Sequence, residues 1–216
     1  MLSRLLAGAR ISLGLGVTAV IGAMVLGSLL GAWAGATGGS LDEAVMRTAD
    51  FVLVLPALYV ALVLRASLPL VLPAGQVFAL LTIIFALLGW PIVARGVRGI
   101  VAREREREYV MAARSLGAST PRVLVRHLLP ACAGHVAVQA SLLLPAFVLA
   151  EAALSFVGLG FPLTTPTWGT MLADAADINE LTRFPWVLAP ALAVMAVTLM
   201  TNLVLQPGSR APGRVS

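Results

Sequence analysis

The chain has 216 residues, of which 59% are hydrophobic and only 12% are charged, and its formal net charge is +5. About a quarter of the residues of a soluble domain are charged, so this balance indicates an integral membrane protein. The fold class predicted from its helix-length apolar segments is all-α. All 15 basic residues are arginine. Since lysine is absent, a phosphate-binding loop ending in GK[ST] is excluded, and any ATP hydrolysis must take place on another chain.

Five apolar segments are long enough, or nearly so, to cross a hydrocarbon core of about 30 Å. The predicted spans lie near 11–36, 49–66, 76–94, 131–157 and 184–206, which together make a transmembrane domain over 11–206. Residues 1–10 form an N-terminal segment and residues 207–216 a C-terminal tail. Within the first span, Gly27, Gly31 and Gly35 form a GxxxGxxxG row that predicts close packing against another helix.

Arginine placement predicts the topology. The segment 95–130 holds eight arginines and is therefore expected in the cytoplasm, together with the tail that carries Arg210 and Arg214. Five spans then place the N-terminus outside, although it carries Arg4 and Arg10. We therefore expect that a further transmembrane helix belongs before this chain. The alternative is a secretory signal peptide, whose apolar region of about 7–15 residues is shorter than the run found here.

The segment from Arg103 to Pro130 is a long charged insert in this apolar chain. It begins with RERERE, whose alternating signs predict a solvated helix supported by i,i+3 pairs such as Arg103 with Glu106. Thr120 is the predicted N-cap of a second helix, with Pro121 at its first position and its end at Pro130.

Between these ends, small and apolar residues recur at helical spacing, namely Tyr109, Ala112, Ala113 and Leu116. Gly117 then supplies the left-handed residue that ends a helix. A short helix with two adjacent alanines can enter a groove, so the pattern predicts an element that docks onto a partner.

These residues carry a family resemblance. Ala112, Ala113, Gly117, Leu129 and Pro130 match the pattern AAxxxG followed at a fixed distance by LP, which resembles the cytoplasmic EAA loop of ATP-binding-cassette importer permeases. The stretches REYVMAARSLGAS, RHLLP, LAEAALSFVGLG and PTWGTML further resemble the C-type permease subunit of the dipeptide/oligopeptide/nickel group.

The resemblance runs from about Leu2 to about Asn202 and has three departures. Met111 stands where the family usually has glutamate, and LQPGSRAPGRVS replaces the family's polar ending. As the third departure, we expect the family's first transmembrane helix to be missing from this chain.

The resemblance implies a type I importer transmembrane domain in a bacterial or archaeal cytoplasmic membrane. It implies four partners besides the lipid bilayer: two ATPase subunits, a second, B-type permease and an extracytoplasmic solute-binding protein. ATP would be bound by the ATPase subunits, with no cofactor in this chain, and nucleic acid is not an expected partner. The cargo would be peptides, nickel or related small solutes. The implied ATPase-coupling residues are Tyr109, Ala112, Ala113, Gly117, Leu129 and Pro130.

Polar residues within the spans are the remaining candidates. Glu151 is a carboxylate in an apolar span and is a candidate gate or packing residue, unless it is solvated at the interface. Gln139 lies four residues after His135, and hydrogen bonds between helices are expected there in preference to contact with the substrate. Cys132 is expected to be a packing residue, and with only two histidines a metal site is not expected.

The predicted external loop 158–183 contains the acidic residues Asp174, Asp177 and Glu180, three apart, which would be a solvated face or a docking site for the binding protein. Trp168 and Trp186 are expected in an interfacial aromatic belt.

Two functions of other classes stay open. A truncated chain could be a membrane scaffold that does not transport. An ion-coupled carrier would be expected to show more buried ionisable residues than Glu151 alone.

Overall fold

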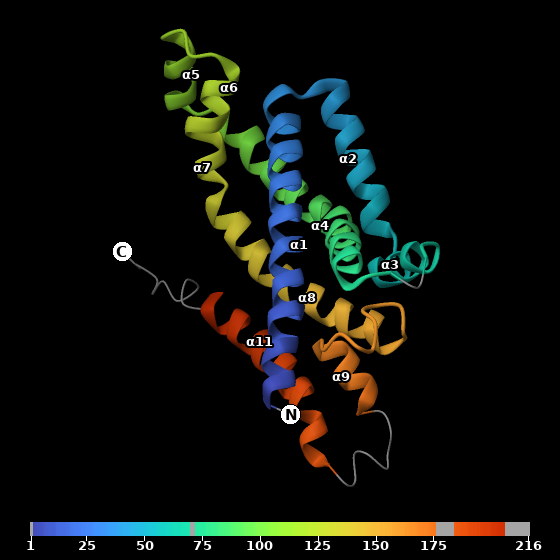
Figure 1. The fold of residues 1–216 in the computed structure, drawn as a ribbon. Coiled ribbons are helices and arrows are strands. Elements are labelled where there is room, and N and C mark those ends of the chain that lie inside the picture. The colour runs from blue at the N-terminus through green and yellow to red at the C-terminus, as the bar shows by residue number, and fades with distance from the viewer. Residues whose placement is uncertain (1, 70–71, 176–183, 206–216) are drawn as a thin grey trace.

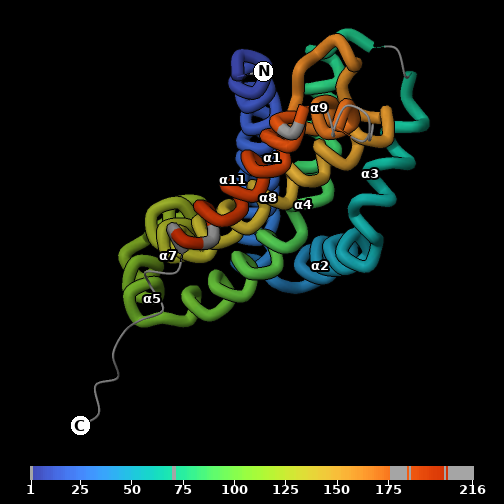
Figure 2. The backbone as a smooth tube through the Cα atoms, turned by 90° about the horizontal axis from the view of Figure 1, so that it is seen from below, coloured from blue at the N-terminus to red at the C-terminus, as the bar shows by residue number. Residues whose placement is uncertain are grey.

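The computed structural model describes residues 2–69, 72–175 and 184–205, and within these ranges every regular element is helical (Figure 1). Among the described residues, three helices are each long and apolar enough to cross a membrane: α1 (Leu2–Thr37), α4 (Ala74–Glu104) and α8 (Ala133–Phe156). The predicted all-α membrane fold is thus confirmed. Figure 2 shows these three helices in the middle of the molecule, with α2 and α3 to one side and α5 and α7 to the other.

Helix α1 is longer than the predicted first span, because it begins at Leu2 instead of residue 11. Its 36 residues correspond to about 54 Å at the helical rise of about 1.5 Å per residue. A hydrocarbon core of about 30 Å cannot contain this length, so part of α1 projects beyond it.

The glycine row of α1 lies against α4. A Cβ atom on Gly27 would come within 2.6 Å of Val93 Cβ, and one on Gly35 within 2.7 Å of the Arg98 carbonyl oxygen. Gly31 similarly faces the backbone of Ala94. Since real Cβ atoms do not approach so closely, the two backbones can lie this near each other only because these side chains are missing.

The predicted span 49–66 is not one straight helix. Helix α2 (Gly39–Val54) begins ten residues before it and α3 (Ala57–Ala66) follows after a bend of 87°. Pro56 has no N–H and disfavours helical geometry in the residue before it, and Leu55 is accordingly extended, with φ −73° and ψ 134°. We call this bend the elbow (residues 54–57).

Beyond α4 the chain forms an outlying hairpin (residues 108–130) at one end of the molecule (Figure 1). It contains α5 (Glu108–Ser115), α6 (Thr120–Val123), the π-helix η1 (Leu124–Leu128) and the beginning of α7 (Leu129–Ala131). After α8, the chain turns through α9 (Trp168–Asp174), the 3-10 helix η2 (Pro185–Leu188) and the 17-residue apolar helix α11 (Ala189–Leu205). Asp177, Glu180 and the tail 207–216 lie outside the described residues.

The core joins α1, α4 and α8. Leu15, Ala19 and Leu81 are fully buried in it. Phe85 of α4 stacks on Phe147 of α8 with ring centroids 5.3 Å apart. This three-helix core holds the outlying hairpin at one end and a buried polar cluster at the other.

Candidate functional site

The outlying hairpin presents apolar side chains that nothing in the described chain covers. Val110 is the only buried residue of α5, and it packs into the main core. By contrast, Met111 is 52% exposed and Leu116 at the tip is 89% exposed. Ala112 is exposed and Ala113 is half-buried beside them. Exposed apolar side chains gathered on a short helix are typical of a surface that binds another protein.

Gly117 ends α5 in the predicted left-handed conformation, with φ +84°. The N–H of Gly117 donates to the Arg114 carbonyl at 2.9 Å, and the N–H of Ala118 donates to the Ala113 carbonyl at 3.0 Å. These two bonds are the Schellman arrangement that closes a helix. A Cβ atom at Gly117 would meet nothing within 4 Å, so the backbone conformation and not the available space calls for glycine.

The second arm of the hairpin differs from the prediction at both ends. The N-cap is Ser119 instead of Thr120, without a side-chain capping bond, and Pro121 follows within the first turn. The arm also continues past Pro130, because the π-helix η1 comes directly before α7. A widened turn of this kind accommodates a residue that cannot donate an N–H bond. Leu129 is half-buried and Pro130 exposed on this arm.

Tyr109 connects the hairpin to the end of α4. Its hydroxyl donates to Glu104 Oε2 at 2.8 Å, and its ring lies 5.9 Å from that of His127. The hydrogen bond to Glu104 raises the pKa of Tyr109 above 10.0, and partial burial and the negative charge of Glu104 act in the same direction. Tyr109 therefore positions α5 relative to α4, and its side chain is also part of the exposed surface of α5.

Two of the arginines counted for the topology pair with carboxylates of α2. Arg98 of α4 donates to both oxygens of Asp42, through Nε at 3.0 Å to Oδ1 and Nη2 at 2.5 Å to Oδ2. Arg95 forms an ion pair with Asp50. These pairs were not predicted, although Asp42 and Asp50 are eight residues apart and so fall on one face of a helix. They fasten α2 to the end of α4 from which the hairpin begins.

A buried polar cluster surrounds Glu151 near the other end of the molecule. Glu151 is fully buried, which excludes the solvated alternative. Its two carboxylate oxygens accept hydrogen bonds from Ser12 of α1 and Ser155 of α8, each at 2.8 Å. Ser12 Oγ in turn accepts from the backbone N–H of Trp168 at 3.1 Å, and Ser155 Oγ accepts from that of Phe161 at 3.3 Å. The cluster thus joins α1, α8 and the 161–168 segment.

Two other predictions need correction, one about the tryptophans and one about His135 and Gln139. Trp168 is 4% exposed and donates from Nε1 to the Leu5 carbonyl, so it is a buried residue and not part of an aromatic belt; Trp186 is exposed. His135 lies against Gly96 of α4. His135 Nε2 and Gln139 Oε1 are buried without a hydrogen-bond partner among the described residues, so the expected interhelical hydrogen bonds are not found at these atoms.

The fold and these sites define a multi-pass helical membrane protein with an exposed apolar hairpin at one end. The chain belongs to the family described as binding-protein-dependent transport system inner membrane component, whose model matches residues 27–206. The resemblance seen in the sequence is thereby confirmed.

Three relatives are named as peptide permeases. The oligopeptide transport system permease protein OppC of Bacillus subtilis (strain 168) is 38% identical over 205 residues, which cover 94% of this chain and 64% of the relative. The di/tripeptide transport system permease protein DppC of Pseudomonas aeruginosa (strain UCBPP-PA14) is 38% identical over 205 residues, with 94% and 65% covered. The dipeptide transport system permease protein DppC of Alkalihalophilus pseudofirmus is 36% identical over 203 residues, with 94% and 64% covered. The chain spans slightly less than two thirds of the length of these relatives.

Proposed function

We propose that this chain is a permease subunit of an ATP-driven peptide importer, coupled to separate ATPase subunits through the outlying hairpin. The observation that carries the proposal is the exposed apolar surface of α5, with Leu116 89% exposed beside a glycine-closed turn. The names of the three relatives favour peptides over nickel as the cargo. The partners would be two ATPase subunits, a second permease and a solute-binding protein.

In this proposal the hairpin and the tail face the cytoplasm, and ATP is bound and hydrolysed by the partner chains alone. The hairpin can transmit force because it is fixed at two points, where Val110 packs into the core and Tyr109 bonds to Glu104. The Arg98–Asp42 pair holds α2 against α4, the helix from which the hairpin begins. ATP shifts the transport cycle only if it binds one arrangement of the complex more tightly than the other. At the end of the molecule opposite the hairpin, the Glu151 cluster would join α1 and α8, the helices that move during transport.

The first test separates the importer from a scaffold or an ion-coupled carrier. The chain is expressed with the ATPase, permease and binding-protein genes of its own genome and captured in mild detergent. An importer subunit is expected to bring with it an ATPase and a second permease, and to support ATP-dependent peptide uptake in proteoliposomes. Capture of the chain without an ATPase would contradict the proposal, as would uptake that follows an ion gradient in the absence of ATP.

The second test changes Gly117 to valine. A non-glycine residue in the left-handed region is disfavoured by about 1–2 kcal/mol, so the α5 turn is expected to open and peptide uptake per ATP hydrolysed to fall several-fold while the complex still assembles. Gly39→Val is the matched control, because Gly39 has φ +69° and open space around it but lies outside the hairpin. Equal uptake by Gly117→Val and the unmodified complex would refute the coupling role.

A further inference from the structure

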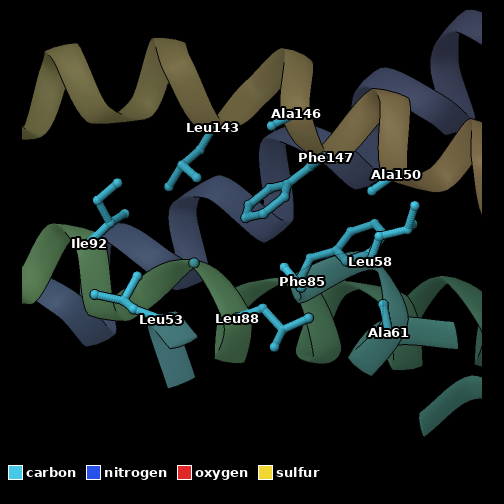
Figure 3. Close-up of a pocket in the computed structure, with 12 residues that line it drawn as sticks. Leu53, Leu58, Ala61, Phe85, Leu88, Ile92, Leu143, Ala146, Phe147 and Ala150 are labelled. Carbon is cyan, nitrogen blue, oxygen red and sulfur yellow. The ribbon is translucent and has the colours of Figure 1, made fainter. Parts of the chain in front are cut away.

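Two open apolar surfaces of the described chain differ in how much they reveal about a partner. One is a cavity of about 330 Å³ beside the elbow, between α3, α4 and α8, with the stacked rings of Phe85 and Phe147 in its lining (Figure 3). Each of the twelve residues that line it is apolar, so its chemistry does not select an occupant. The other surface is the outlying hairpin, where charged side chains stand among the exposed apolar ones.

The hairpin lies on the aqueous side of the membrane. The uncharged part of α4, residues 74–94, is about 30 Å long at about 1.5 Å per residue, which matches the thickness of the hydrocarbon core. The charged end of α4, from Arg95 to Glu104, adds about 14 Å, whereas a headgroup layer is about 5–8 Å thick. The hairpin begins at Glu108, beyond this end. Its exposed apolar side chains therefore face water, and covering them with a partner is favourable.

Three arginines border these apolar side chains, and all three are exposed: Arg114, Arg122 and Arg126. Arg114 follows Met111 by three residues, and Arg122 precedes Val125 by three. Residues at this spacing are neighbours on a helix surface. Met111 is 52% exposed and Val125 is 64% exposed. Each arm of the hairpin thus presents an arginine beside an exposed apolar side chain.

The chain itself does not neutralise the arginines of the hairpin. None of the three forms an ion pair with the described residues, whereas Arg95, Arg98 and Arg107 in the preceding segment each pair with a carboxylate. Glu108 is the one carboxylate in the sequence from 108 to 130, and it lies at the base of α5, six residues before Arg114. Three arginines and one glutamate leave the hairpin with two positive charges in excess.

A partner that covers the apolar side chains must also face these guanidinium groups. Removing a guanidinium from water is costly unless a carboxylate of the partner compensates it. Arginine and a carboxylate can form two parallel hydrogen bonds, which adds specificity to the contact. A groove lined by neutral or basic residues is therefore a poor fit for this hairpin, and an acidic one is a good fit.

We infer that the outlying hairpin fits a groove of the ATPase subunit that has an apolar floor and an acidic rim. The exposed apolar side chains fill the floor, and the three arginines pair with carboxylates of the rim. The inference rests on the proposed function, which supplies the ATPase, and it adds the chemistry of the surface that the hairpin contacts.

Association kinetics of the complete permease with its ATPase test the inference. The two permease subunits are held in nanodiscs of neutral phosphatidylcholine, and binding of the purified ATPase is followed by biolayer interferometry at low and at high salt. Charge pairs at the rim of an interface act mainly on the association rate. Arg114→Glu is therefore expected to slow association several-fold at low salt and to weaken its salt dependence, and Arg122→Glu on the other arm is expected to do the same.

Two comparisons make the result specific. Arg47→Glu is the matched control, because Arg47 has a side chain that is 78% exposed outside the hairpin, and its reversal changes the net charge equally without slowing association. Leu116→Asp is expected to speed dissociation several-fold instead, since the loss of buried apolar contact acts mainly on the dissociation rate. Replacing carboxylates around the ATPase groove with arginine, one at a time, is expected to yield a variant that restores association with Arg114→Glu.

Each contrary outcome identifies what fails. Equal association rates for both glutamate variants of the hairpin and the unmodified complex overturn the inference, and they leave the importer proposal intact because the ATPase still binds. An effect that appears only when anionic phosphatidylglycerol is added to the nanodiscs assigns the arginines to lipid headgroups and also overturns the inference. Absence of ATPase binding to the unmodified complex overturns the inference and the importer proposal together.

Discussion

Removal of the Glu151 carboxylate is the most informative perturbation of the polar cluster. The carboxylate accepts two buried hydrogen bonds of 2.8 Å, from Ser12 and Ser155. At about 1.5 kcal/mol for each bond, Glu151→Ala is expected to lower the free energy of unfolding by about 3 kcal/mol. Glu151→Gln keeps an acceptor for one hydroxyl and is expected to lose about half as much.

The assay is equilibrium unfolding of the purified chain in mixed detergent micelles, followed by circular dichroism. Leu142→Ala provides the control, because Leu142 is on the same helix but is half exposed and contributes little buried contact. A double-mutant cycle between Glu151→Ala and Ser12→Ala measures the pair directly and is expected to give a coupling energy of about 1–2 kcal/mol. A loss below about 0.5 kcal/mol for Glu151→Ala, within the range of ordinary surface substitutions, would refute this account of the cluster.

Two further predictions concern packing and pH. Gly31→Ala is expected to destabilise the chain by about 1–3 kcal/mol relative to Gly14→Ala, because of these two changes only the one at Gly31 brings the new methyl group against the α4 backbone, at 2.8 Å from Ala94 Cα. Unfolding in detergent measures the stability of both variants. Equal stabilities would contradict the close packing of α1 on α4. The raised pKa of Tyr109 means that its protonated hydroxyl stabilises the folded state below pH 10.0 and that this contribution is lost as pH rises through the folded pKa. The alkaline loss of stability should therefore be smaller in Tyr109→Phe, as thermal unfolding from neutral to alkaline pH would reveal, and an unchanged profile would count against the Glu104 bond.

The sequence predicts the backbone of the hairpin correctly where a single residue decides the conformation. Gly117 follows a run of helix-forming residues, and its left-handed φ was predicted because a helix ends easily at glycine. The second arm was predicted less well. Thr120 and Ser119 are both good capping residues, and only the packing of Val123 into the core selects the register.

The elbow shows the same limit on a larger scale. A proline within an apolar span, such as Pro56, can kink a helix or end it, and the local sequence does not decide between the two. The bend of 87° lets α3 pack against α4, and this packing is not encoded near Pro56. The Asp42–Arg98 pair was missed for the same reason, because the two residues are far apart in the sequence.

The sequence by itself determined the membrane character of the chain, its helical class, its family and the shape of the α5 turn. These follow from composition, from runs of apolar residues and from short motifs, all of which act over a few helical turns. The tertiary structure alone decided that Glu151 is buried and hydrogen-bonded to Ser12, that Trp168 is inside, and that the elbow lies beside an apolar cavity. Each of these depends on which helices lie side by side, and in an apolar environment that is decided by side-chain fit and interhelical hydrogen bonds between residues distant in sequence.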